Sequence, residues 1–373
     1  MAHQKRVLSD AERLDWLRLA RTDNVGPITF RGLVRRFGGA GAALDALPEL
    51  ARRGGRTRPL KPPSAAEAED ELAALAGIGA RLVAAVEADY PEPLAAIDDA
   101  PPVVAVAGPA DLLARPAVGI VGARNASVNG RRIAERLAGE LGEAGLTVVS
   151  GLARGIDAAA HAGSLASGTV AVMAGGIDAI YPQENTALYQ RIAASGVLLS
   201  ECRFGTEPQA RHFPRRNRLI SGLSLGVVVV EAAQRSGSLI TARLAAEQGR
   251  QVFAVPGSPL DPRARGCNDL IRNGVTLVQS AADVLEGIAP MLRPPPGPRR
   301  GPGYLADGDD PPAARTAPEA HAVVLECLSP TPTPVDELVR DCQLSAPVVL
   351  TVLLDLELAG RIERQPGNRV SLI

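Results

Sequence analysis

The chain has 373 residues with a formal net charge of −1, 46% hydrophobic residues and 22% charged residues. This length accommodates two or three domains, and the balanced charge excludes a chain that is basic or acidic as a whole. The longest run of Val, Ile and Leu, Val227 to Val230, has the length of a strand, and the N-terminus has no apolar signal core. We therefore expect a cytoplasmic protein that does not enter a membrane.

The cysteines carry no sign of a metal site or a disulfide framework. None of them belongs to a CxxC pair, and no histidine lies at metal-ligand spacing from them. We expect ordinary thiols of a reducing compartment and no bound metal. The four cysteines are Cys202, Cys267, Cys327 and Cys342.

The N-terminal segment, up to about residue 76, has the apolar spacing of helices. It starts at Ser9, a suitable helix cap, and Val25-Gly26-Pro27 interrupts the pattern before ITFRGLVRRFGG resumes it. Residues 1–61 hold 13 basic and 6 acidic residues. The segment is either a nucleic-acid module of the SAM-like or helix-hairpin-helix type, whose glycine turn offers amides to a phosphate, or a small helical bundle with a solvated face.

Val103 to Gly108 form a predicted short strand, and from Ala117 onward apolar runs of strand length alternate with amphipathic segments. Near-continuous apolar strands separated by helices are typical of a parallel sheet covered on both faces. We therefore predict an α/β fold with a Rossmann-like, doubly wound, mostly parallel sheet. In the amphipathic segment SLITARLAAEQG, Ser238 is the expected helix cap. The predicted strands are 103–108, 118–123, 146–150, 169–174, 197–201, 225–232, 251–255 and 275–279.

The last part of the chain contains a predicted linker and a third domain. Residues 290–318 hold 9 prolines and 4 glycines, a composition typical of a flexible linker. The three helical segments and the hairpin that follow indicate a winged helix-turn-helix, with Ser345 capping its third helix. This helix, VVLTVLLDLEL, is apolar for a DNA-reading element, so contact with DNA, contact with protein and a purely structural role all stay open. The predicted domains are 1–80, 81–289, the linker 290–318, and 319–373.

Candidate ligand contacts follow the predicted strands, because ligands of doubly wound sheets bind beyond the carboxyl ends of the strands. Most of the residues there are small and let a backbone approach phosphate oxygens, and Arg124 can pair with a phosphate through its guanidinium. No GxGxxG follows the first strand, so we expect no dinucleotide and no other cofactor. These candidates are Gly122, Arg124, Ser150, Gly151, Gly175, Gly176, Ser236, Gly237 and Ser238.

A basic segment supplies the second group of candidates. Between Arg203 and Arg218 there are five arginines and one acidic residue. Phe213 is notable in a chain with 3% aromatic residues, since an aromatic ring beside arginines can stack on an unpaired base; the alternative is an anchor in the core. The candidates in this segment are Arg211, Phe213, Arg215, Arg216, Asn217 and Arg218.

The residues give little support to an enzyme. Asp157 and His161 lie four residues apart on one helical face, without an evident third catalytic or metal-binding partner. Glu231, at the end of a predicted strand, is placed to hold a ribose hydroxyl. It supports an alternative function, a phosphoribohydrolase that acts on a nucleotide-derived ligand on a related Rossmann-like scaffold. A winged-helix transcription regulator is a further alternative.

Several motifs together resemble the DNA-processing protein A (DprA/Smf) family, over roughly residues 80 to 288. They include VGIVGARNAS, SGLARGIDAAAH, GGIDAIYPQEN, HFPRRNRLISGLS and VVVVEAAQRSGSLITARLAAEQGRQVFAVPG. The resemblance implies a protein without catalytic activity that binds incoming single-stranded DNA in natural transformation. It also implies loading of the RecA recombinase in homologous recombination, interplay with single-strand-binding protein, and a homodimer.

The resemblance also assigns roles to particular residues. Arg124 matches the family arginine that grips a DNA phosphate, and Phe213 matches the aromatic residue of the FPxRN segment. The lysine that many members carry three residues before this aromatic falls on Ala210. Neighbouring Arg211 is the candidate substitute for that lysine.

Overall fold

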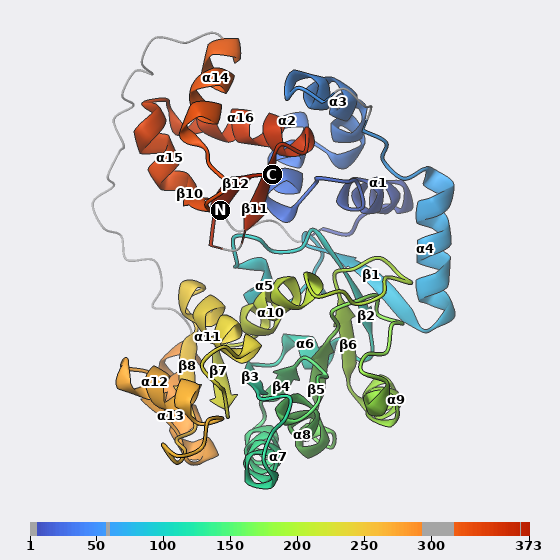
Figure 1. Ribbon diagram of the computed structural model, residues 1–373. Helices are drawn as coiled ribbons and strands as arrows, with labels where there is room; N and C mark the ends of the chain where they lie inside the picture. Colours follow the sequence, from blue (N-terminus) through green and yellow to red (C-terminus); the bar gives the residue numbers. More distant parts are fainter. Residues whose placement is uncertain (1–5, 57–59, 293–316, 366) are drawn as a thin grey trace, which may run out of the picture. The chain divides into compact units, whose positions relative to one another are not determined.

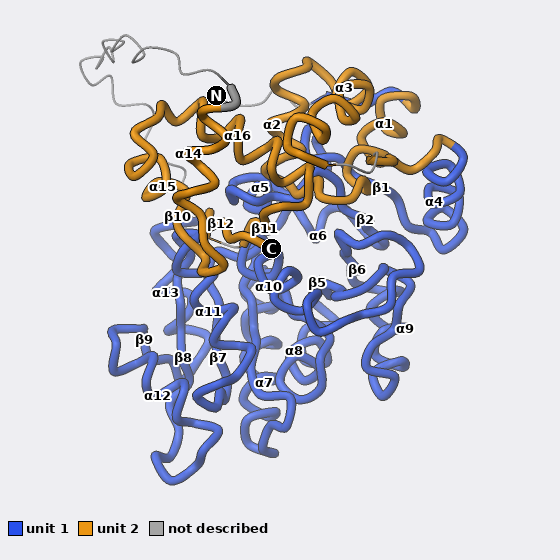
Figure 2. Tube along the Cα trace, turned by 45° about the horizontal axis from the view of Figure 1, so that its top comes forward, with its two compact units in different colours: residues 1–9, 66–293 blue, residues 10–65, 294–373 orange. Residues whose placement is uncertain are grey.

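The computed structural model describes residues 6–56, 60–292, 317–365 and 367–373. The chain divides into two compact units, drawn in different colours in Figure 2. Unit 1 consists of residues 1–9 and 66–293, and unit 2 of residues 10–65 and 294–373. Unit 2 is therefore built from both ends of the chain. The domain boundaries expected from the sequence stay predictions.

A nine-stranded sheet is the framework of unit 1 (Figure 1). Its strands are β1 (Ala80–Ala84), β2 (Val103–Ala107), β3 (Ala117–Gly122), β4 (Thr147–Ser150), β5 (Thr169–Val172), β6 (Val197–Ser200), β7 (Gly226–Val230), β8 (Gln251–Ala254) and β9 (Thr276–Leu277). The order is β1-β2-β6-β5-β4-β3-β7-β8-β9. All neighbours from β6 to β9 pair in parallel, whereas β1 and β2 add an antiparallel edge beside β6. The predicted α/β fold with a mostly parallel sheet is confirmed.

The apolar strands form because both faces of the sheet are covered by helices. Side chains alternate along β7, so that Val227 and Val229 join one core cluster while Val228 and Val230 join the other. Helices α10 and α11 cover the first face, and α7, α8 and α13 cover the second. The helices of unit 1 are α4 (Ala65–Gly77), α5 (Glu92–Ala95), α6 (Asp111–Ala114), α7 (Val128–Glu143), α8 (Ile156–Ser164), α9 (Thr186–Ser195), α10 (His212–Leu223), α11 (Gly237–Glu247), α12 (Arg265–Arg272) and α13 (Ala281–Leu292), with the 3₁₀ turn η1 (Gln183–Asn185).

The strand order places a switch point between β3 and β7. From β3 the chain proceeds through β4 and β5 to β6, then returns to β7 beside β3 and continues to β8 and β9. Connections leave the sheet in opposite directions at such a point, which opens a crevice at the carboxyl ends of the two strands. This crevice and the strand ends beside it are therefore the places to search for a ligand site.

Unit 2 combines the N-terminal helices with the winged helix. Its elements are α1 (Asp10–Ala20), α2 (Pro27–Phe37), α3 (Ala40–Arg53), α14 (Ala317–Cys327), α15 (Val335–Cys342), α16 (Ala346–Leu358), β10 (Thr333–Pro334), β11 (Ile362–Gln365) and β12 (Arg369–Leu372). The last three form a small antiparallel sheet in the order β10-β12-β11. Three helices followed by this hairpin confirm the predicted winged helix.

Some local expectations change in the structure. The cap of α11 is Ser236, whose hydroxyl accepts from the amide of Ser238, so the predicted cap at Ser238 is wrong. Ser345 occupies the N-cap position of α16 without a side-chain capping bond. Of the expected linker, residues 290–292 belong to α13 and residues 317–318 to α14, and the rest lies outside the described residues.

We expect the contact between α7 and α8 to tolerate an added methyl group on one helix but not on the other. A Cβ at Gly163 of α8 would overlap the carbonyl oxygen of Glu135, whereas one at Gly139 of α7 would lie 3.5 Å from the Gly163 oxygen, an ordinary contact. Gly163→Ala should lower the free energy of unfolding by ~1–3 kcal/mol through overpacking. Gly139→Ala, the matched control, should be neutral or stabilise by up to ~1 kcal/mol through helix propensity. Urea unfolding measures both, and equal effects of the two changes would contradict the packing described.

Candidate nucleic-acid interface

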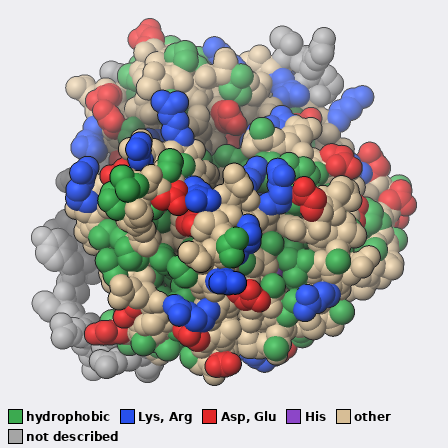
Figure 3. Space-filling view, turned by 60° about the horizontal axis from the view of Figure 1, so that its bottom comes forward, with side chains coloured by type: hydrophobic (Ala, Val, Ile, Leu, Met, Phe, Trp, Pro, Cys, Tyr) green, Lys and Arg blue, Asp and Glu red, His purple; other side chains and the backbone are tan. Residues whose placement is uncertain are grey.

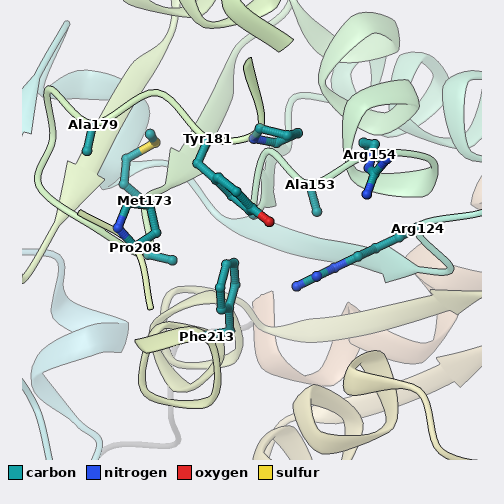
Figure 4. Close-up of a pocket in the computed structure, with 11 residues that line it drawn as sticks. Arg124, Ala153, Arg154, Met173, Ala179, Tyr181, Pro208 and Phe213 are labelled. Carbon is teal, nitrogen blue, oxygen red and sulfur yellow. The ribbon is translucent and has the colours of Figure 1, made fainter. Parts of the chain in front are cut away.

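A pocket opens at the carboxyl ends of β3, β4 and β5 (Figure 4). It lies beside the switch point and not within it, since no lining residue comes from β7 or the loop that follows it. Arginines and aromatic side chains from separate segments meet here. The lining residues are Arg124, Gly151, Ala153, Arg154, Met173, Ala174, Ala179, Tyr181, Pro182, Pro208 and Phe213.

Phe213 connects the aromatic and the basic parts of the pocket. Its ring lies 5.7 Å from that of Tyr181, centroid to centroid, at an interplanar angle of 60°. The guanidinium carbon of Arg124 lies 4.8 Å from the Phe213 ring centroid, within the range of a cation–π contact. Figure 4 shows the Arg124 side chain extending toward Phe213, with the Tyr181 side chain above the ring in this view. The side chain of Arg124 is exposed and that of Phe213 half-buried, so both can reach a ligand.

A buried cation lies beneath this pocket. Arg216, 5% exposed, donates from Nη1 to the carbonyl oxygens of Gly151 and Val172, the latter at 2.7 Å. Burial lowers the pKa of Arg216 to about 10, although the carboxylate of Asp157 opposes this shift and Arg124 adds to it. The guanidinium therefore remains charged at neutral pH. Its hydrogen bonds hold the ends of β4 and β5 together under the pocket.

The loop between β4 and α8 is held by side chains from α8 itself. The Asp157 carboxylate accepts from the amides of Gly151 and Ala153, at 3.2 and 3.3 Å. The amide of Leu152, a residue with φ of 55°, donates to Nε2 of His161 at 3.3 Å. These amides point into the protein, so the expected donation from the Gly151 backbone to a phosphate is not available in this conformation. Asp157 and His161 serve the core, as their spacing without a third partner indicated.

His161 has a defined neutral tautomer. Its Nε2 accepts from Leu152, and its Nδ1 lies 2.7 Å from the hydroxyl of Thr169, which itself donates to the carbonyl oxygen of Val148. Nδ1 therefore carries the proton. Complete burial lowers the pKa of His161 to about 3, with the charge of Arg216 acting in the same direction.

At the switch point itself, an internal carboxylate takes the place where a ligand was expected. Glu231, which follows β7 with φ of 55°, accepts from the amide of Ser127 at 2.8 Å and from its hydroxyl at 2.5 Å. Ser127 in turn caps α7 by accepting from the amide of Gly130. A carboxylate at the positive end of a helix is favourable. Glu231 thus stabilises the start of α7. The ribose contact proposed for it from the sequence would require its hydrogen bonds with Ser127 to break.

The arginines of the basic segment separate into exposed and buried ones. Arg211 and Arg215 are exposed at the start of α10, and the side chain of Arg203 is 47% exposed. Arg218 is 5% exposed, pairs with Glu201 and Asp99, and does not line the pocket. Burial opposes its charge, but the two carboxylates outweigh burial and raise the pKa of Arg218.

None of the remaining predicted residues lines the pocket, and most of them are buried within the protein, whereas Gly237 is exposed. The hydroxyl of Ser150 donates to the carbonyl oxygen of Ile120 at 2.6 Å, and Asn217 donates to that of Gly237 at 3.4 Å. The hydroxyl groups of Ser236 and Ser238 form a hydrogen bond with each other. Close neighbours leave no room for a Cβ at three of the predicted glycines, Gly122, Gly175 and Gly176. Of the fifteen residues predicted, Arg124, Gly151 and Phe213 line the pocket.

Two pocket residues could have been inferred from sequence signals. Tyr181 is one of four tyrosines in a chain poor in aromatic residues, and Arg154 belongs to the same SGLARGIDAAAH motif as Gly151. The loops that bring them to the pocket are not readable from periodicity, because each turns back over a strand end. Pro208 and Ala179 have no comparable signal.

The pocket can bind an anion that carries flat rings. Arg124 and Arg154 supply positive charge, and Phe213 and Tyr181 supply faces for stacking. Within the part of the chain that the structure describes, no group of three or more His, Cys, Asp or Glu side chains is arranged to hold a metal ion. The described helices include none with the length and apolar character needed to cross a membrane.

The fold and the pocket together define a class: a Rossmann-like binding protein, joined to a helical N-terminal module and a winged helix, whose site suits a polyanion with aromatic rings. Family models give the identity of each part. Residues 81–289 match the model described as DNA recombination-mediator protein A, residues 10–74 the DprA-like N-terminal HHH domain, and residues 308–368 the DprA winged helix domain. The chain belongs to the DprA/Smf family, the DNA recombination-mediator protein A family.

Relatives and solved structures agree with this membership. The chain is 34% identical to Protein Smf of Synechocystis over 97% of its own length and 99% of that protein. Its fold is similar to the crystal structure of DNA processing protein A from Streptococcus pneumoniae, with a TM-score of 0.64 and 34% identity over 75% of this chain and 98% of that one. A DNA processing protein A from Helicobacter pylori, described for its single-stranded DNA binding mode, has a TM-score of 0.51 and 29% identity over 54% and 94% of the two chains.

Neutral His161 makes stability depend on pH. Its folded pKa of about 3 lies below the ordinary value of 6.5, so between these values the unfolded chain binds more protons and the folded state loses stability as pH falls. We expect up to ~1.4 kcal/mol per pH unit below 6.5 from this residue. Asp157, whose pKa burial raises, acts in the opposite sense, so wild type must be compared with His161→Gln. Urea unfolding between pH 7 and pH 5 should show a smaller loss in the variant; equal losses would mean that His161 is not held neutral.

Proposed function

We propose that this protein is a single-stranded DNA-binding recombination mediator of natural transformation that loads the RecA recombinase. The observation that carries the proposal is the contact of the Phe213 ring with both the Tyr181 ring and the guanidinium of Arg124. Bases of a single strand have free faces that stack on aromatic rings, while the adjoining phosphates pair with arginine. In a duplex the bases are already stacked on each other, so this pocket favours single strands.

Family membership supports the proposal independently of the pocket. The family description names a DNA recombination mediator, and the Helicobacter pylori relative is described as binding single-stranded DNA. The motifs that carry the resemblance include the segments of Arg124 and Phe213. The same two residues therefore stand out by geometry and by family motif. No observation of comparable strength favours a phosphoribohydrolase, because Glu231 is engaged by Ser127.

The exposed arginines indicate a path for the strand on either side of the pocket. Arg211 and Arg215 lie at the start of α10, two residues before and two residues after Phe213. Arg154 lines the pocket from the β4–α8 loop. Arg211 then replaces the missing lysine at Ala210. Figure 3 shows one face of the molecule, where Lys and Arg side chains are spread among hydrophobic and acidic ones and do not form one continuous patch.

We further propose that the protein acts without a cofactor or catalytic group, as a cytoplasmic homodimer, with RecA and single-strand-binding protein as its partners. A mediator must hold DNA while a recombinase assembles on it, which requires binding and not bond cleavage. A pocket of stacking faces and arginines supports binding in this sense.

Removal of Arg124 should weaken binding to single-stranded oligonucleotides of any sequence. The expected loss is ~1–3 kcal/mol, since one charge-assisted contact to a phosphate disappears. The slope of log affinity against log salt concentration should become shallower by about 0.7 for that phosphate. Fluorescence anisotropy over a salt series measures both quantities. Phe213→Ala should lose a similar ~1–3 kcal/mol per stacked base, with an unchanged salt slope.

Arg115→Ala is the matched control for Arg124→Ala. Arg115 is an exposed arginine that pairs with Asp111 at 2.7 Å. It lies just before the amino end of β3, whereas the pocket lies at the carboxyl ends of the strands. Binding by Arg115→Ala should equal that of wild type. Equal losses for the two arginine variants, or a preference for duplex over single-stranded competitor, would reject the proposed site.

RecA loading is testable on single strands coated with single-strand-binding protein. Wild-type protein should shorten the lag before RecA filaments form, as followed by RecA ATP hydrolysis, because it holds the strand for the recombinase. Arg124→Ala should lengthen the lag by about the factor by which it weakens DNA affinity, up to tenfold per 1.4 kcal/mol. A wild-type protein without effect on the lag would exclude mediation while leaving DNA binding intact.

A further inference from the structure

The second half of α16 is buried on all of its sides. Residues 352–358 are buried without exception, whereas residues 346–348, 350 and 351 in the first half are exposed. Val352, Leu353 and Leu356 pack into the core of the winged helix. Because a helix on the surface of a small domain buries one stripe, the opposite side of α16 must be covered by another part of unit 2.

The N-terminal helices provide this cover. A Cβ at Gly32 of α2 would lie 3.2 Å from Cδ1 of Leu354. One at Gly54, directly after α3, would overlap the carbonyl oxygen of Asp355. The two glycines let α2 and α3 approach α16 closely. In winged helix-turn-helix proteins the third helix is the one that enters a DNA groove, and here α16 is covered along half of its length.

The contact places a carboxylate at the start of α2. Glu357, 6% exposed, accepts from the hydroxyl of Thr29 and, at 2.9 Å, from Nε of Arg364. Its second oxygen would lie 3.1 Å from a Cβ on Gly26, the N-cap residue of α2. Gly26 has no side chain to cap the helix, and the first turn of α2 has no acidic residue. Glu357 thus supplies the negative charge that the positive end of a helix favours.

The end of α16 is held by the same module. The carbonyl oxygen of Leu358 accepts from Nδ2 of Asn24 at 3.5 Å and from Nη1 of Arg56 at 3.4 Å. Asn24 belongs to the turn between α1 and α2, at residues 21–26, and has φ of 62°. The turn therefore contacts α16 from two directions, through Asn24 and through the start of α2.

This contact carries an electrostatic cost. Among the described side chains, Asp355 Oδ1 and Arg364 Nη1 are buried without a hydrogen-bond partner. Burial raises the pKa of Glu357, against the opposing effects of Arg364 and Thr29. Unsatisfied polar atoms and buried carboxylates lower the stability of the closed arrangement relative to an open, hydrated one. The contact is thus suited to a reversible closure.

We propose that α16 and the turn at residues 21–26 form an internal latch, in which Glu357 occupies the start of α2 as a phosphate would, and that the backbone of duplex DNA opens the latch by replacing Glu357. Helix starts are general binding places for phosphate, and a carboxylate is the side-chain group closest to it in charge. Closed, the latch masks both the turn and the second half of α16. Open, both face the solvent together. The device is separate from the pocket of unit 1.

Glu357→Gln in the full-length chain tests the latch, because it removes the charge and keeps the shape. Amide hydrogen exchange should rise about tenfold in residues 26–31 and 352–358, and affinity for a short duplex of random sequence should rise by a similar factor, since the closed state no longer competes. Addition of that duplex to wild type should accelerate exchange in residues 352–358, which lose their cover, and slow it in residues 26–31, whose amides then donate to a phosphate. Fluorescence anisotropy with the labelled duplex measures the affinity.

Glu337→Gln is the matched control, an exposed glutamate on α15 that should change neither quantity. Faster exchange in Glu357→Gln with unchanged duplex affinity would overturn the proposal, because the contact would then be structural alone. Unchanged exchange would overturn it as well.

Thr29→Val is the second variant, should Glu357→Gln fail to fold. It removes one hydrogen bond to Glu357 and keeps the pair with Arg364. It should act in the same direction with a smaller effect, and an unchanged duplex affinity would again reject the latch. Repeating the titration in an Arg124→Ala background separates the latch from the pocket, since the increase in duplex affinity should persist there.

Discussion

The site of unit 1 depends on the buried guanidinium of Arg216. It joins the ends of β4 and β5 by donating hydrogen bonds to their carbonyl oxygens, and it balances the carboxylate of Asp157 that fixes the β4–α8 loop. A buried charge is tolerated only where hydrogen bonds and an opposite charge surround it. Arg216 therefore sets the position of the loop that carries Arg154, and it sits under the ring of Phe213, 6.0 Å from its centroid. The exposed groups that meet a ligand rest on this arrangement.

Much of the fold follows from the sequence because its signals are local. The apolar runs and their alternation with amphipathic segments place every parallel strand within a few residues. The site follows less completely. A run such as RRNR at a helix start looks solvated, yet Arg216 and Arg218 are buried while Arg215 is exposed. Which arginine is buried depends on the carboxylates of Asp157 and Glu201, which lie outside this run of sequence.

Ligands of doubly wound sheets bind beyond the carboxyl ends of the strands, and this expectation located the site only approximately. The reason is physical. The crevice at β3 and β7 has the helix start that an anion favours, but Glu231 satisfies it from within the chain. The pocket extends from the end of β3 to the ends of β4 and β5. There the groups available to a ligand are side chains and not backbone amides. Glu357 is a second case in which a carboxylate of the chain itself lies at a helix start where an anion could bind. The second half of α16, residues 352–358, is covered from two sides, which one stretch of sequence does not reveal.

Unit 2 is assembled from residues 10–65 and from the last part of the chain, and residues 66–293 of unit 1, which include its whole sheet, are encoded between them. This has a consequence for synthesis on the ribosome, where domains generally fold as they emerge. The sheet of unit 1 can be completed once residue 277 has left the exit tunnel. Helices α2 and α3 emerge before it but cannot find α16 until more than 300 residues have been made, as the separation of Thr29 and Glu357 by 328 positions shows. Until translation ends, the N-terminal helices have an uncovered apolar side. A nascent chain that stalls before α16 therefore exposes a surface that the finished protein hides, and chaperones that recognise apolar surface would distinguish the two.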